Sequence, residues 1–255
     1  SGAEPIDAEW VETVNEWRER WPYYDDQFND YPDQIVPEVA LDELSKQLDP
    51  DNSIVTTEVG QHQMWAHQHI GREHARSFLS SGGLGTMGFG FPAAIGAKFG
   101  CPDKQVVCVA GDGSFQMNSQ EMATAAINNA AVKVFLLDNR ALGMVHQWQK
   151  LFYHERYSST ILDPVPDFVK LADAYGWEGE RIEKPEEVAP AIARMLASDK
   201  PYLLDVAISP DQNVYPMVAP GAALDNVIGA IDVTLGAVRV NGKGVGKKDE
   251  KEGEE

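Results

Sequence analysis

The strongest constraint on the fold is the alternation of apolar segments with amphipathic ones between residues 53 and 209. The apolar segments, such as VVCVA (106–110) and VFLL (134–137), are continuous rather than interrupted by polar residues. Continuous apolar strands are typical of a parallel sheet whose two faces are both buried. The order of strands and helices therefore predicts an α/β fold, a parallel sheet with helices on both faces.

The expected elements follow from apolar runs and from apolar residues at helical spacing. Strands are expected at 53–60, at the start of 75–100, and at 105–113, 131–139, 177–183 (an edge strand) and 201–209. Helices are expected at 7–21, 36–48, the end of 75–100, 119–130, 143–153, 167–176 and 185–198.

One large domain is predicted at residues 35–240 of the 255 in the chain. Residues 1–34 are expected to form a connector with a lead-in helix, and the charged residues 241–255 a disordered tail. The chain starts with Ser and has no basic, apolar leader, so we expect a fragment or a processed chain without a signal peptide.

The charge and the cysteines exclude some classes of partner and compartment. A net charge of −19 argues against nucleic acid, which needs clustered Lys and Arg. No apolar run approaches the roughly 18 residues of a membrane span, so no membrane partner is expected. The two cysteines, Cys101 and Cys108, are too few for a disulfide framework, which favours a reducing, cytoplasmic location.

Two predicted strands end in groups suited to a cation. One ends in Gly111-Asp112-Gly113-Ser114 and the next in Asp138-Asn139. If these strands are neighbours, Asp112 and Asn139 lie side by side at one edge, and their oxygens suit Mg²⁺. The N–H groups of Gly113 and Ser114 would open a helix, which is a favourable seat for phosphate. A plain helix cap at Asp112 remains an equal alternative on this local pattern.

Other patterns are weaker. Residues 83–88 (GLGTMG) fit the dinucleotide-binding pattern, but Asp103, the acid at about the right distance, precedes its strand. His67 and His69 are expected to be structural, since residues two apart on a helix face different ways. His62, at a strand end, is a better site candidate.

A helix expected at 143–153 carries apolar residues every four positions: Met144, Trp148 and Phe152. Such a stripe is usually core. Because the helix closely follows Asn139, we expect Met144 and Trp148 to line a pocket.

Four segments resemble acetolactate synthase (acetohydroxyacid synthase), a family of thiamine diphosphate enzymes, and specifically the C-terminal domain of its catalytic subunit. They are EVGQHQMWAHQ (58–68), SSGGLGTMGFGFPAAIGA (80–97), AGDGSFQMNSQE (110–121) and NRALGMVHQWQ (139–149). The segment VYPMVAPGAALDNVI (214–228) is similar to the end of that family, so the resemblance covers about residues 35 to 230.

The resemblance implies roles for particular residues. Mg²⁺ is expected on the side chains of Asp112 and Asn139 and on the carbonyl of Ala141. Residues implied in cofactor binding are Val59, Gly60, Gln61, His62, Gly85, Met87, Gly111, Asp112, Gly113, Ser114, Asn139, Ala141, Gly143 and Met144. Met87, beside the cofactor rings, Met144, and Trp148, at the pocket for the second 2-ketoacid, are the implied catalytic residues.

The implied reaction joins two 2-ketoacids, pyruvate with pyruvate or 2-ketobutyrate, with loss of CO2, in branched-chain amino-acid biosynthesis. The family's other two domains supply a catalytic glutamate and bind FAD, and neither fits in this chain, so we expect it to be inactive alone. A homodimer or higher homo-oligomer is expected, and a regulatory subunit is possible. The family usually has Asn where this chain has Asp138.

Other functions remain open on the sequence. A related thiamine diphosphate enzyme, such as a pyruvate oxidase or a glyoxylate carboligase, would share the cofactor motifs. A non-catalytic cofactor-binding module and a dinucleotide-binding protein are the alternatives from other classes.

Overall fold

The computed structural model describes residues 7–20, 33–223, 226–228, 231–232, 237–240 and 243–244. The chain divides into two compact units, residues 31–214 and residues 1–30 together with 215–255. The predicted boundaries at 34/35 and 240/241 stay predictions. The tail expected at 241–255 lies outside the described residues except for 243–244.

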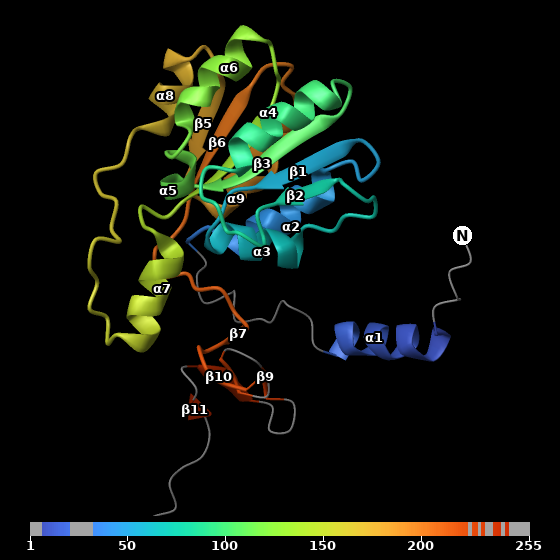
Figure 1. Cartoon of the computed structure of the whole chain (residues 1–255), viewed down its shortest axis with the longest axis vertical. Helices are drawn as coiled ribbons and strands as arrows, with labels where there is room; N and C mark the ends of the chain where they lie inside the picture. The colour runs from blue at the N-terminus through green and yellow to red at the C-terminus, as the bar shows by residue number, and fades with distance from the viewer. Residues whose placement is uncertain are drawn as a thin grey trace, which may run out of the picture. The chain divides into compact units, whose positions relative to one another are not determined.

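The larger unit is built on a six-stranded sheet in the order β2-β1-β3-β4-β6-β5 (Figure 1). All of its neighbouring strands are parallel, which confirms the predicted fold class. The edge position of β5 was also predicted correctly. The strands are β1 (Ser53–Thr57), β2 (Phe78–Ser80), β3 (Gln105–Gly111), β4 (Lys133–Asp138), β5 (Glu178–Ile182) and β6 (Tyr202–Ala207).

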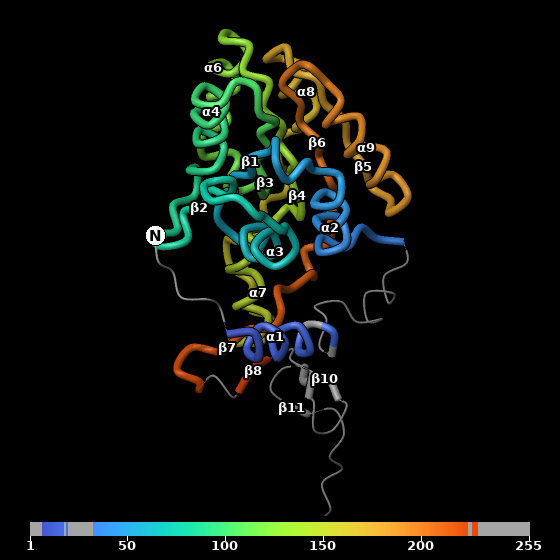
Figure 2. Tube along the Cα trace, turned by 90° about the vertical axis from the view of Figure 1, so that its right-hand side faces the viewer, coloured from blue at the N-terminus to red at the C-terminus, as the bar shows by residue number. Residues whose placement is uncertain are grey.

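Helices cover both faces of this sheet. The helices of the larger unit are α2 (Pro37–Gln47), α3 (Gln61–His69), α4 (Gly90–Gly100), α5 (Asp112–Phe115), the short 3-10 helix η2 (Ser119–Glu121), α6 (Met122–Ile127), α7 (Gly143–Phe152), α8 (Phe168–Ala174) and α9 (Pro185–Ala197). Figure 2 shows α4 and α6 on one side of the strands and α2 and α9 on the other. The helix α7 lies beyond the sheet, near the short α5 (Figure 1).

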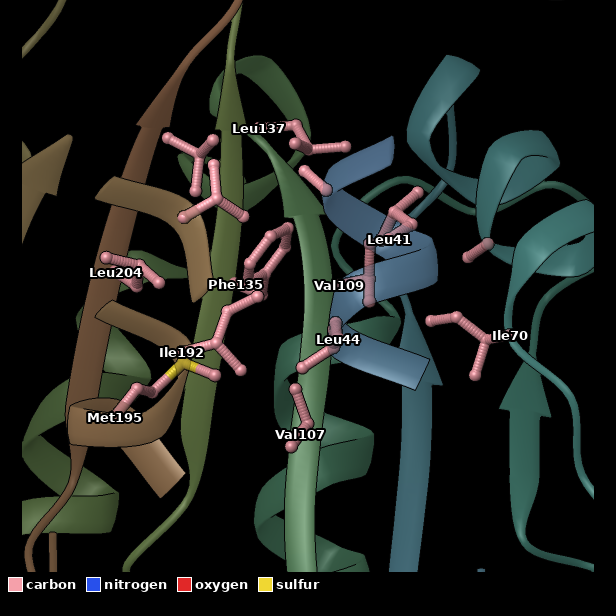
Figure 3. Packing of buried hydrophobic residues seen from close by; sticks show 14 of the residues in the cluster. Leu41, Leu44, Ile70, Val107, Val109, Phe135, Leu137, Ile192, Met195 and Leu204 are labelled. Atoms are coloured by element: carbon pink, nitrogen blue, oxygen red, sulfur yellow. The ribbon is translucent and has the colours of Figure 1, made fainter. Parts of the chain in front are cut away.

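The strands β1, β3, β4 and β6 send alternate residues into two separate cores. Val107 and Val109 of β3 pack with Leu41 and Leu44 of α2 in the first core, which Figure 3 shows. Cys108, between the two valines, belongs to the second core, under α4, α6 and α8. A strand whose two faces are both buried needs apolar residues at every position, and this is the physical origin of the continuous apolar runs.

Some elements differ from the predicted ones. The helix expected at 119–130 begins as η2, and α6 already ends at Ile127. It ends there because Asn129 adopts a positive φ of 51°, a left-handed conformation that Asn tolerates better than most residues. The strand expected at 105–113 ends at Gly111, because Asp112 opens α5.

The smaller unit is described in part. Its helix α1 (Ala8–Arg20) confirms the helix predicted at 7–21, and Trp10 packs edge-to-face on Trp17 with 5.6 Å between ring centres. Its strands are β7 (Met217–Val218), β8 (Val227–Ile228), β9 (Ile231–Asp232), β10 (Ala237–Val240) and β11 (Lys243–Gly244). Across the described parts of both units, no helix has the length and apolarity needed to span a membrane.

The start of α4 lies directly against the end of β1. The Thr56 hydroxyl donates to the Gly90 carbonyl oxygen over 2.8 Å. A Cβ atom at Gly90 would lie 2.4 Å from the main-chain nitrogen of Glu58 and 2.4 Å from the carbonyl carbon of Thr57. Main-chain atoms of a buried strand cannot move aside at low cost, so this contact requires glycine.

We therefore expect Gly90→Ala to lower the free energy of unfolding by about 2 kcal/mol or more, as overpacking does. Gly96→Ala, on the same helix, is the matched control, because no described atom lies within 4 Å of its Cβ position. The control should leave stability unchanged or raise it by up to about 1 kcal/mol. Urea unfolding followed by circular dichroism measures both, and equal effects of the two variants would contradict the packing described.

Candidate functional site

The ends of β1, β3 and β4 meet at one edge of the sheet and line a hollow there. We call it the strand-end hollow. It is lined by Val59, Gln61, His62, Trp65, Met87, Gly111, Asp112, Gly113, Ser114, Leu137, Asn139, Ala141, Leu142 and Ile208. Because β3 and β4 are parallel neighbours, Asp112 and Asn139 line the same hollow, as the sequence predicted.

Asp112 is almost fully buried, and its Oδ2 atom has no hydrogen-bond partner among the described residues. Burial, followed by the charge of Asp138, raises the pKa of this carboxyl group to about 8, although N–H groups at the start of α5 oppose the shift. The N-cap residue of α5 is Gly111 and Asp112 is the first residue of the helix, so Asp112 is not the plain helix cap that the sequence left as an alternative. An unpartnered carboxylate oxygen in a buried site is the feature that a bound cation would satisfy.

Asn139 is held in place by two hydrogen bonds. Its Oδ1 accepts from the main-chain N–H of Ala141 over 3.0 Å, and its Nδ2 donates to Oε1 of Gln61 over 3.3 Å. An amide oxygen has two lone pairs, so Oδ1 retains one for a metal ion. No group of three or more His, Cys, Asp and Glu side chains around a common point occurs in the described chain. A site made of one carboxylate, one amide and one carbonyl needs no such group.

His62 fills the space that two glycines leave open. A Cβ atom at Gly111 would lie 2.6 Å from its Nδ1, and one at Gly60 would lie 2.8 Å from its Cε1. Burial lowers the pKa of His62 to about 3, so the ring is neutral. Its Nε2 lies 3.4 Å from the Ser114 hydroxyl. His62 can therefore orient a ligand at the start of α5 by hydrogen bonding but cannot attract it by charge.

The glycine loop at 83–88 is fixed by a residue whose role the sequence did not reveal. Glu58, fully buried at the end of β1, accepts from the main-chain N–H of Gly88 over 2.7 Å and of Phe91 over 2.9 Å. It thereby caps α4 from another element and fixes the loop that carries Met87. Asp103, which the dinucleotide reading needed at a strand end, lies before β3, as expected.

A buried chain of amides connects the hollow to α7. Nε2 of Gln61 donates to Oε1 of Gln147 over 2.8 Å and to the carbonyl oxygen of Gln212. Gln147 then exchanges two hydrogen bonds with the main chain of Val214, at 2.8 and 3.0 Å. Sequence reasoning missed Gln147, although a glutamine among the apolar residues of an amphipathic helix is a usable signal.

The remaining predicted residues lie around the strand-end hollow rather than in its lining. A Cβ atom at Gly143 would lie 2.0 Å from Oε1 of Gln61, so α7 begins in contact with the site. Gly85 lies in the glycine loop with a φ of +69°. Met144 and Trp148 line a second hollow along α7, together with Val145, Gln149, Tyr153 and Arg156.

Comparison with known proteins agrees with this geometry. Residues 58–206, more than half of the chain, match the family described as thiamine pyrophosphate enzyme, C-terminal TPP binding domain. The acetolactate synthase isozyme 2 large subunit of Escherichia coli is 51% identical over 195 residues, which are 76% of this chain and 35% of that protein. The probable acetolactate synthase large subunit of Methanococcus aeolicus is 47% identical over 229 residues, 88% of this chain and 37% of that protein.

A third relative is the acetolactate synthase large subunit of Corynebacterium glutamicum, 44% identical over 226 residues, 86% of this chain and 36% of that protein. This chain spans little more than a third of the length of these relatives.

The raised pKa of Asp112 predicts a pH-dependent cost in the absence of metal. Unfolded, the carboxyl group ionises above about pH 4; folded, it keeps its proton up to about pH 8. Stability therefore falls as the pH rises between these values. We expect Asp112→Asn in EDTA to be more stable than the wild type at pH 8 by on the order of 1–3 kcal/mol. This gain should vanish near pH 4.

Adding Mg²⁺ should stabilise the wild type at pH 8 but not Asp112→Asn, as urea unfolding would measure. Asp103→Asn, at an exposed aspartate, is the control and should behave as the wild type. An Asp112→Asn variant that is less stable than the wild type at pH 8 in EDTA would show that the ionised carboxylate has a partner.

Proposed function

Because this chain belongs to the thiamine pyrophosphate (TPP) enzymes, as their C-terminal TPP-binding domain, we propose that it binds Mg²⁺ and TPP as part of an acetolactate synthase. The proposal of a metal site rests on the buried Asp112. Its Oδ2 has no hydrogen-bond partner among the residues described, and Asp112 lines the same hollow as Asn139. The large-subunit relatives support the choice of reaction.

The charges around the hollow favour a cation. Burial and the negative charges of Asp138 and Asp205 all raise the pKa of Asp112. Arg181 contacts Asp138 and Asp205 but not Asp112 in any described ion pair. A divalent cation at Asp112, Asn139 and the carbonyl of Ala141 would compensate the remaining negative charge with the oxygen ligands that Mg²⁺ prefers.

The start of α5 provides the place for the diphosphate. The N–H groups of Gly113 and Ser114 lie in its first turn, and Ser114 also offers a hydroxyl group that lies 3.1 Å from the Gly111 carbonyl oxygen. Neutral His62 and Gln61 would orient the phosphate oxygens by hydrogen bonds. When bound, TPP supplies the electron sink that a 2-ketoacid needs to lose CO2.

The substrates would approach from α7. Trp148 is partly exposed and packs edge-to-face on Phe152, 5.6 Å between ring centres. Met144 and Trp148 give the second hollow, which runs along α7, an apolar wall that suits the alkyl groups of pyruvate or 2-ketobutyrate. We propose that two such 2-ketoacids condense here, a step of branched-chain amino-acid biosynthesis.

The rest of the proposal concerns what lies outside this chain. Since the chain spans about a third of its relatives, we propose that further domains, one of them holding FAD, complete the enzyme. A homo-oligomer, a regulatory subunit and a cytoplasmic location stay predictions. The chain by itself should not form acetolactate.

Titration calorimetry of this chain with TPP tests the binding step. Heat should appear only when Mg²⁺ is present, and Asp112→Asn should weaken binding at least about tenfold, as loss of a metal contact does. Asp103→Asn should bind as the wild type does. TPP binding that is equally tight in EDTA, or unchanged in Asp112→Asn, would refute the metal site.

An activity assay tests the reaction. Pyruvate with Mg²⁺ and TPP should yield no acetolactate with this chain alone, and acetolactate once the remaining domains are present. Turnover by the chain alone would refute the requirement for those domains. With phosphate and O2 also supplied, acetyl phosphate as the product of the complete enzyme would indicate a pyruvate oxidase instead.

A further inference from the structure

An ionic cluster that contains two buried carboxylates lies next to the predicted metal ligand Asn139; its arginine, Arg181, is 27% exposed and also pairs with the exposed Glu183. Nη1 of Arg181, on the edge strand β5, lies 2.7 Å from Oδ2 of Asp205 on β6 and 2.7 Å from Oδ2 of Asp138 at the end of β4. The side chains of both aspartates are at most 3% exposed. Arg181 and Asp205 are paired in register, so the arginine reaches across β6 to the last residue of β4.

Asp138 also shapes the turn that follows it. Its other oxygen, Oδ1, accepts from the main-chain N–H of Arg140 over 3.1 Å. Arg140 has a φ of 53°, in the left-handed region that is unfavourable for residues other than glycine. In the same turn, Oδ1 of Asn139 accepts from Ala141. Two side-chain hydrogen bonds thus hold the main chain from Asp138 to Ala141 in a strained shape.

The cluster needs its arginine. Burial and the charge of Asp138 together raise the pKa of Asp205 to about 6, although Arg181 opposes the shift. Oδ1 of Asp205 has no hydrogen-bond partner within the described part of the chain. Without Arg181, two buried carboxylates would face each other unpaired, and removing one partner of a buried pair costs far more than the pair contributes. Asp138 would then have to turn towards water and release Arg140.

We propose that Arg181 is a positioning residue for the metal site. By holding the Asp138 carboxylate, it holds the turn at 138–141, which carries Asn139 and the carbonyl of Ala141. It touches neither metal nor cofactor. The part of this inference that concerns Mg²⁺ rests on the proposed function, whereas the part that concerns the turn does not.

A second arginine, which lies on α9 and pairs with a residue of β5, provides a matched control. Arg194 of α9 makes a two-point pair with Glu180 of β5, at 2.7 and 3.0 Å. In this pair 55% of the Arg194 side chain is accessible, and among the described residues its hydrogen bonds to Glu180 do not involve the turn at 138–141. If ion pairs of arginine with β5 only stabilised the fold, replacing Arg181 and replacing Arg194 would change the amide exchange of the turn to the same extent.

The experiment compares Arg181→Met with Arg194→Met by two readouts. The first is amide hydrogen exchange of the turn in the ligand-free chain. The amides of Arg140 and Ala141 should exchange about tenfold faster or more in Arg181→Met, because the turn opens locally. Arg194→Met should leave them unchanged. The second is the Mg²⁺ concentration that half-saturates TPP binding, which should rise about 10- to 100-fold only in Arg181→Met.

If Arg181→Met does not fold, Arg181→Lys is measured in its place. It keeps one charge but loses the planar guanidinium, and its exchange rates should exceed those of the wild type. Turn exchange that is unchanged in the Arg181 variants, or equally raised in Arg194→Met, would overturn the proposal. If the wild type binds no Mg²⁺ at all, the proposed function fails, and the exchange data still decide whether Arg181 holds the turn.

Discussion

A carboxylate that is buried at the end of a parallel strand, with one oxygen unpartnered among the described residues, is the constraint on which this site depends. Asp112 is almost fully buried, and the nearby Asp138 and Asp205 are also acidic. A protein keeps such a group only where something outside the chain compensates it or where it stays protonated. The parallel sheet brings Asn139 and Ala141 to the same hollow, and these are the oxygen donors that a compensating cation needs.

The surrounding residues fix this edge of the sheet in position. Glu58 holds the glycine loop, Gln61 connects Asn139 with α7, and Arg181 secures the turn after β4. Each acts from a different strand or helix, and each is largely or partly buried. Precise placement of oxygen donors requires such support, because a cation site or a cofactor site tolerates little displacement of its ligands.

Much of the fold and part of the candidate site could be predicted from the sequence, for physical reasons. Continuous apolar runs predict a doubly covered parallel sheet, and the rule that strand ends share one edge brings Asp112 and Asn139 together. The roles of Glu58 and Arg181 could not be predicted, because they depend on strand register and on contacts between residues 30 or more positions apart. The early end of α6 was predictable in principle, since two asparagines follow it.

Diffraction from crystals grown with TPP and with Mn²⁺ in place of Mg²⁺ tests the central claim most directly, because the anomalous signal locates the ion without assumption. The account predicts one Mn²⁺ bonded to a carboxylate oxygen of Asp112, to Oδ1 of Asn139 and to the carbonyl oxygen of Ala141, at the start of α5 beside the cofactor's phosphates. An ion bound elsewhere, or TPP bound in this hollow with no ion at Asp112, would contradict it.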